Sequence, residues 1–196
     1  IQEGCVLVSV NTKVKYVMLF IILNFFTYFG IQLLVTTGEY DLLTFLDLEI
    51  PFVPQFIWIY HTLLPVIIIT LLFFIQKKEL FFSTIIALLL ATSILSFFYI
   101  LFPSFYPREG FVDNSSVSGL LVELTRKIDS AHNTFPSGHV AFAWLTLFFI
   151  GISNCGQKNK LIYWGYFIWA SLISIATLTL KQHYIVDVFS GVILAY

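Results

Sequence analysis

The sequence predicts an all-α integral membrane protein, built as a bundle of six transmembrane helices with the last one truncated. Three observations support this prediction. The 196 residues are 59% hydrophobic and only 11% charged, whereas a soluble domain carries about a quarter charged residues. The apolar residues gather in runs close to the ~20 residues that a helix needs to cross a bilayer. None of these runs alternates apolar and polar residues with the period of two that a membrane-spanning strand requires.

Six apolar runs are the predicted spans. The first five are Tyr16–Val35, Phe52–Ile75, Leu80–Phe102, Phe135–Ile152 and Leu161–Leu180. The sixth begins at His183 and is cut off at Tyr196, and the chain opens on Ile1, so we expect both ends to be trimmed. Residues 1–196 are predicted to form a single domain. Its two cysteines are too few for a disulfide framework.

The connection from Pro103 to Thr134 is the only long one, and we expect an amphipathic interfacial helix inside it, between spans three and four. Asp113-Asn114-Ser115-Ser116 is typical of a turn followed by the start of a helix. Apolar residues then recur at helical spacing, and charged ones fill the other face. The apolar set is Val117, Leu120, Leu121, Leu124 and Ile128, and the charged set is Glu123, Arg126 and Lys127. Such a helix lies at the membrane surface or folds back over a site.

The loop charges predict the orientation in the membrane. Six of the ten basic residues fall in loops on one side, at Lys13, Lys15, Lys77, Lys78, Lys158 and Lys160. The opposite side holds nine acids: Glu39, Asp41, Asp47, Glu49, Glu109, Asp113, Glu123, Asp129 and Asp187. Basic loops stay in the cytoplasm, so we expect a cytoplasmic N-terminus. The net charge of −1 argues against a nucleic-acid partner.

The segment Pro136-Ser137-Gly138-His139 opens the fourth span and predicts a phosphate site. Proline suits the first helical turn because its missing N–H is not needed there. The backbone N–H groups of Ser137, Gly138 and His139 are then expected to be unpaired donors for an anion. Gly138 allows a close approach, Ser137 adds a hydroxyl, and His139 is placed to protonate a leaving oxygen.

The segment Lys181-Gln182-His183-Tyr184-Ile185-Val186-Asp187 opens the sixth span on the same outer side. His183 and Asp187 are four residues apart, so they share one face of a helix. Asp187 can accept from one ring nitrogen of His183 and leave the other as a lone pair that attacks phosphorus. The ammonium of Lys181 can pair with phosphate oxygens. A two-histidine, one-carboxylate metal site is the weaker interpretation, because a lysine and an anion-binding helix start favour a negative ligand.

These residues resemble the type 2 phosphatidic acid phosphatase/vanadium haloperoxidase superfamily. Its second motif, Pro-Ser-Gly-His, is intact at Pro136–His139, and its third, Ser-Arg-x(5)-His-x(3)-Asp, matches at His183 and Asp187. The arginine of the third motif falls at Thr177. Lys181-Gln182-His183-Tyr184 and Asp129 with Asn133 look more like the inositol phosphorylceramide synthase-like branch, which transfers a phospho-headgroup between lipids.

The resemblance implies a role for each residue of the site. His183 is the nucleophile that forms a phosphohistidine, Asp187 orients it, and His139 is the general acid and then the base. Ser137 and Gly138 hold phosphate oxygens. Lys181, Arg108 and Arg126 are the candidate replacements for the missing arginine. The resemblance implies no metal and no cofactor.

The predicted protein is a membrane-embedded lipid phosphate phosphatase or phosphotransferase that acts on the extracytoplasmic face. Its partners are a lipid phosphate or lipid diphosphate substrate and the surrounding membrane lipids. An alcohol in place of water as acceptor makes it an inositol phosphorylceramide synthase-like headgroup transferase, and this alternative stays open. A non-enzymatic transporter or scaffold is the alternative from another class. The lipid and the oligomeric state are left open by the sequence.

Overall fold

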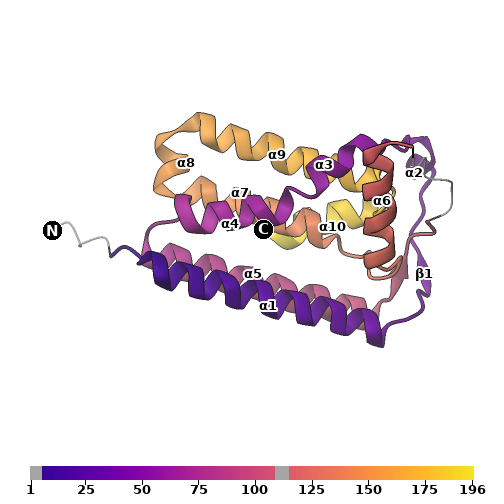
Figure 1. Cartoon of the computed structure of the whole chain (residues 1–196), viewed down its shortest axis with the longest axis horizontal. Coiled ribbons are helices and arrows are strands. Elements are labelled where there is room, and N and C mark those ends of the chain that lie inside the picture. Colours follow the sequence, from indigo (N-terminus) through magenta and orange to yellow (C-terminus); the bar gives the residue numbers. More distant parts are fainter. Residues whose placement is uncertain (1–5, 109–114) are drawn as a thin grey trace.

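The long helices run side by side along the longest axis of the molecule (Figure 1). They belong to a computed structural model, in which residues 6–108 and 115–196 are described. These helices are α1 (Val10–Leu34), α5 (Lys78–Leu101), α7 (Gly138–Ile152), α9 (Lys160–Thr179) and α10 (Ile185–Ala195). α1 starts six residues before its apolar run, because the Ser9 side chain caps the helix by accepting from the Thr12 N–H.

The second apolar run is a broken helix. It consists of η1 (Pro54–Phe56), α3 (Ile57–Tyr60), α4 (Leu63–Ile69) and the π-helical η2 (Thr70–Phe74). The break falls at His61 and Thr62. Pro65 explains it, because a proline inside a helix has no N–H to donate and its ring clashes with the carbonyl four residues earlier, here that of His61.

Four helical segments in the described part of the chain are long and apolar enough to cross a membrane. They are Val10–Leu34, Pro54–Phe74, Lys78–Leu101 and Lys160–Thr179. α7 and α10 are apolar but shorter, with 15 and 11 residues, so α7 is only about 22 Å long against ~30 Å of hydrocarbon. Four spans are therefore supported directly, and the full set of six stays a prediction.

α7 is the central helix of the bundle, packed against α5, α9 and α10. Its side chains at Val140, Ala141 and Ala143 are fully buried. α10 comes especially close, because a Cβ added at Gly191 would lie 2.7 Å from the Ser137 carbonyl oxygen and 3.1 Å from the Val140 Cβ. The absence of a side chain at Gly191 thus leaves room for α7 to pack closely.

α6 (Val117–Ile128) runs across one end of the bundle (Figure 1). The Ser116 side chain caps it by accepting from the Gly119 N–H, whereas Asp113 and Asn114 of the expected turn lie outside the described residues. Val122 is fully buried, and the apolar side chains on the opposite face are exposed. The exposed set is Val117, Leu120, Leu124 and Ile128. The helix is therefore amphipathic, and its position at a membrane surface stays a prediction.

The end of the bundle that carries α6 also holds Asp41, Asp47 and Glu49, which together we call the acidic layer. β1 (Tyr40–Asp41) pairs in parallel with β2 (Ser104–Phe105), and α2 (Phe45–Glu49) follows β1. α8 (Asn154–Lys158) lies at the other end, near the start of α1 (Figure 1). The acidic and basic loops thus occupy opposite ends, as the loop charges predict.

The close approach of α10 to α7 generates a stability prediction. Gly191→Ala forces the two helices apart, and we expect it to lower the free energy of unfolding by about 1–3 kcal/mol. Gly165→Ala is the matched control, because nothing lies within 4 Å of the position of its Cβ. Thermal unfolding of the two variants in detergent measures the difference. Equal melting temperatures would show that the helices are not packed as tightly as described.

Candidate active site

The two motifs meet where α7 and α10 begin. The Ser137 N–H donates to the Asp187 carbonyl at 3.0 Å, and a ring nitrogen of His183, Nδ1, lies 2.9 Å from the Thr134 carbonyl oxygen. Ser137 is the N-cap of α7, and its hydroxyl accepts from the Val140 N–H. Two expectations are corrected here. Pro136 precedes the helix instead of standing in its first turn, and the Ser137 N–H is not a free donor because it ties α7 to α10.

His183 is held in one orientation by its Nδ1 atom. A carbonyl oxygen can only accept, so Nδ1 carries the proton that it shares with Thr134, and Nε2 is left with a lone pair. An Asp187 carboxylate oxygen, Oδ2, lies 3.4 Å from the same Nδ1. Asp187 is completely buried, and its Oδ2 also accepts from the Tyr184 N–H at 2.9 Å. Asp187 thus places a negative charge beside the imidazole.

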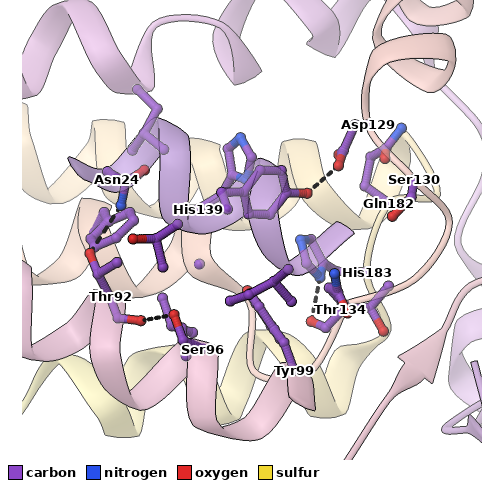
Figure 2. Close-up of a pocket in the computed structure, with 18 of the residues that line it drawn as sticks. Asn24, Thr92, Ser96, Tyr99, Asp129, Ser130, Thr134, His139, Gln182 and His183 are labelled. Atoms are coloured by element: carbon purple, nitrogen blue, oxygen red, sulfur yellow. Dashed lines mark hydrogen bonds between the residues drawn. The ribbon is translucent and has the colours of Figure 1, made fainter. Parts of the chain in front are cut away.

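His139 lies in the first turn of α7 and lines the same cavity as His183 (Figure 2). Its ring stacks on the ring of Tyr60, with centroids 4.0 Å apart and planes inclined by 24°. The centroids of the His139 and His183 rings are 6.3 Å apart. The structure therefore brings the two predicted catalytic histidines to one cavity.

The turn before α10 rests on the acidic layer. Asp47 is buried, and its carboxylate accepts from the Ile185 N–H at 2.8 Å. The Asp41 carboxylate accepts from the Tyr184 hydroxyl at 2.7 Å. At the other side of the turn, the Thr177 carbonyl accepts from the N–H groups of Gln182 and His183. Thr177, which stands where the family motif has an arginine, therefore anchors this turn through its backbone carbonyl.

Lys181 is turned toward the acidic layer and does not line the cavity. Its ammonium donates to the Asp47 carbonyl at 2.9 Å, and its φ of 55° is in the left-handed region that a lysine rarely adopts. Burial lowers the pKa of Lys181, with the charge of Asp47 acting in the opposite direction. The Lys181 ammonium is therefore bound to a backbone carbonyl of the protein and is not directed into the cavity.

The two arginines are placed differently from each other. Arg108 lines the cavity, donates to the Ser130 carbonyl at 2.7 Å and forms an ion pair with Asp129 at 3.5 Å. Arg126 lies outside the cavity lining, with its guanidinium carbon 5.3 Å from the centre of the Phe52 ring. Burial and the charge of Arg108 lower the pKa of Arg126. Arg108 is therefore the one of the three candidate cations that borders the cavity.

The cavity has a volume of about 230 Å³ and lies between α1, α4, α5 and α7. Its polar end is formed by the histidines and by the segment before α7, and its other end extends between hydrophobic side chains. Figure 2 shows the polar end around Asp129, Gln182 and His183, and a separate polar pair, Asn24 with Thr92, further along. The apolar lining includes Phe20, Ile31, Ile67, Leu95 and Phe142. This shape suits a molecule with a polar head and an apolar tail.

The sequence interpretation missed several residues of the site. Tyr60 was hidden in an apolar run, as was Tyr99, whose hydroxyl donates to the Pro136 carbonyl at 3.0 Å. Thr134 was missed because it contacts His183 through its backbone carbonyl, a group that every residue carries. Asn133 and Gln182, which the sequence interpretation named only for the branch resemblance and not as site residues, line the cavity; their position directly beside motif residues is the signal that could have identified them. Among residues 6–108 and 115–196, no group of three or more histidine, cysteine or acidic side chains is arranged to hold a metal.

The family model described as the PAP2 superfamily matches residues 39–196. The chain belongs to the PAP2 superfamily. This membership supports a phosphatase-type membrane enzyme, and the inositol phosphorylceramide synthase-like branch stays a prediction. The crystal structure of Aquifex aeolicus LpxE shares the fold, with a TM-score of 0.51 and 20% identity over 84% of this chain and 87% of that one. No curated protein sequence matches the chain.

The acidic support of the His183 turn generates a second prediction. Asp47→Ala leaves the Ile185 N–H without its buried acceptor, and we expect this to cost about 1–3 kcal/mol of stability. Activity should fall as well, because the turn carries His183. Glu49→Ala is the matched control, since Glu49 is an exposed acid of the same short helix. Urea unfolding of both variants checks the expectation, and equal midpoints would contradict it.

Proposed function

We propose that the protein is a membrane-embedded lipid phosphate phosphatase that works through a phosphohistidine on the extracytoplasmic face of the membrane. The observation that carries the proposal is the contact between His183 Nδ1 and the Thr134 carbonyl. It makes Nδ1 the proton-bearing nitrogen and leaves Nε2 as a nucleophile in a residue that lines the cavity.

In the first half of the reaction, Nε2 of His183 attacks phosphorus and the bond from phosphorus to the leaving oxygen breaks. The imidazole becomes positive, and the buried carboxylate of Asp187 stabilises that charge. His139 donates its proton to the leaving alkoxide. In the second half, His139 takes a proton from water as the water oxygen attacks phosphorus, which releases phosphate and restores His183.

The phosphate oxygens need donors at the same place. The first turn of a helix has N–H groups without helical acceptors, and here they belong to Gly138 and His139 at the start of α7. The Ser137 hydroxyl lies at the same helix end. Arg108 borders the cavity, and its buried Nε has no partner among the described residues. These groups supply positive charge from side chains and backbone dipoles.

The lipid tail has a lateral route into the cavity. α1 packs along α5 and against η2, but it makes only sparse contact with α4, although both line the cavity. At the far end Lys13 joins α1 to η2, because its ammonium donates to the Leu72 carbonyl and to the Gln76 side chain, both at 2.9 Å. A tail can lie between α1 and α4, so only the head reaches the histidines.

We propose that the chain crosses the membrane six times. Six spans with a cytoplasmic N-terminus put the basic loops inside and the site outside. α6 then lies at the outer surface with Leu120 and Leu124 in the lipid, and residues 1–196 act as one domain. An alcohol acceptor remains compatible with the same chemistry, since only the oxygen that attacks the phosphohistidine differs. The transporter or scaffold alternative predicts no turnover.

Substitution of the histidines tests the proposal. His183→Ala should lower the rate of phosphate release from phosphatidic acid by at least about 1,000-fold. His139→Ala should lower it by about 100- to 10,000-fold, the usual range for loss of a general acid. Gln157→Ala is the control, because Gln157 is exposed in α8, at the other end of the bundle, and does not line the cavity. It should stay within about threefold of the unsubstituted rate.

Vanadate and a chelator supply an independent measurement. Vanadate adopts the five-coordinate geometry of phosphorus at the transition state and should inhibit strongly, whereas the chelator should have no effect. Full activity in folded His183→Ala and His139→Ala variants would rule out the proposed roles. Loss of activity with the chelator would favour a metal mechanism instead.

A further inference from the structure

Two buried amide side chains at the polar end of the cavity have no hydrogen-bond partners. Asn133 is 3% exposed and Gln182 is 2% exposed, and both line the cavity. Neither the amide nitrogen nor the amide oxygen of either residue has a partner among the described residues. An unpaired buried polar group costs about 1–3 kcal/mol, so four such atoms together indicate a ligand.

The two amides flank the nucleophile. Gln182 immediately precedes His183, and Asn133 immediately precedes Thr134, whose carbonyl holds the His183 ring at 2.9 Å. The backbone is in the left-handed region at or beside both amides: Asn133 has a φ of 65°, and Lys181, next to Gln182, has a φ of 55°. Left-handed backbone at two non-glycine residues costs free energy and tends to occur at functional sites.

The chemistry of the amides restricts what can bind there. A primary amide offers N–H donors and one carbonyl acceptor. A phosphate group can satisfy the N–H donors, but its oxygens cannot donate to the carbonyls of Asn133 and Gln182. The partner of these carbonyls must therefore carry an O–H or N–H group close to phosphorus. A simple phosphate monoester that is fully ionised has none.

We propose that Asn133 and Gln182 form a subsite for an alcohol hydroxyl that attacks the phosphohistidine. This inference rests on the proposed function and specifies its acceptor. The hydroxyl oxygen approaches phosphorus opposite the His183 Nε2 atom, while further hydroxyls of the alcohol donate to the amide carbonyls. The oxygen–phosphorus bond forms, the Nε2–phosphorus bond breaks, and the hydroxyl proton passes to His139. The products are a phosphate ester of the alcohol and neutral His183.

The Asn24 and Thr92 pair illustrates the alternative role of polar groups in this bundle. The Asn24 amide nitrogen donates to the Thr92 hydroxyl at 3.0 Å, which joins α1 to α5. That amide serves a helix–helix contact. Asn133 and Gln182 make no such contact through their side chains within the described residues, so a structural role does not account for them.

The test measures how one intermediate divides between two acceptors. The full chain, in vesicles, is supplied with radiolabelled phosphatidic acid and with glycerol in the water, and the ratio of glycerol phosphate to free phosphate is measured. A parallel series replaces glycerol with a short-chain monoacylglycerol, which keeps a second free hydroxyl for the amides and distinguishes a water-soluble alcohol from a lipid alcohol. Because both products arise from the same phosphohistidine, the ratio does not depend on how much of a variant is folded.

We expect the unsubstituted chain to favour one alcohol over water by more than its mole fraction. Gln182→Met should lower that ratio by about tenfold, the effect of one lost hydrogen bond. Gln182→Glu retains a carbonyl acceptor and should keep most of the preference. Gln157→Met is the matched control, since Gln157 is an exposed amide in α8, and it should leave the ratio unchanged.

Two results would overturn the inference. A ratio that follows the mole fraction of both alcohols would mean that the amides hold water. A ratio that is the same in Gln182→Met and Gln157→Met would mean that Gln182 does not contact the acceptor. Either result leaves the phosphatase proposal intact. Turnover without any phosphohistidine would instead contradict the proposed function, and this inference with it.

Discussion

The hydrogen bond between His183 and the Thr134 carbonyl is the contact on which the site depends. It joins the turn before α10 to the turn before α7, and it fixes which ring nitrogen carries the proton. Two neighbouring contacts make it possible. The Ser137 N–H donates to the Asp187 carbonyl, and the absence of a side chain at Gly191 lets α10 approach the backbone of Ser137. Together these contacts bring His139 and His183 to one cavity.

The charged side chains around this junction each have an ion-pair or hydrogen-bond partner. Asp187 is beside His183, and the ion pair of Arg108 with Asp129 closes the polar end of the cavity. Asp129 also accepts from the Tyr28 hydroxyl and from the Gln32 side chain at 3.1 Å. These bonds hold the Asp129 carboxylate to α1, and Asp129 in turn positions Arg108 through the ion pair. The Nε atom of Arg108 takes no part in these contacts and has no partner among the described residues. Ionisable groups inside an apolar bundle are costly and are retained where they serve function.

The sequence predicts the helical fold, and it identifies two histidines that the structure places in one cavity, because both predictions depend on residues that are close together in the chain. It predicts poorly whatever depends on contacts between distant segments. The Ser137 N–H was expected to be free, but α10 uses it. Lys181 was a candidate for phosphate, but the Asp47 carbonyl, 134 positions earlier in the chain, accepts from its ammonium. The break at His61 was not predicted, since Phe52–Ile75 was expected as one span, and neither was the stacking of Tyr60 on His139.

The position of the phosphoryl group on the enzyme tests the central claim most directly. Radiolabelled phosphatidic acid would be mixed with the unsubstituted chain and the reaction stopped within the first turnover, because His139→Ala would slow formation of the intermediate as well as its breakdown. Alkaline quenching and peptide mapping then locate the label. The hydrogen bond from Nδ1 to Thr134 predicts that phosphorus is attached to Nε2 of His183. Label on Nδ1, on another residue or on no residue would contradict the account.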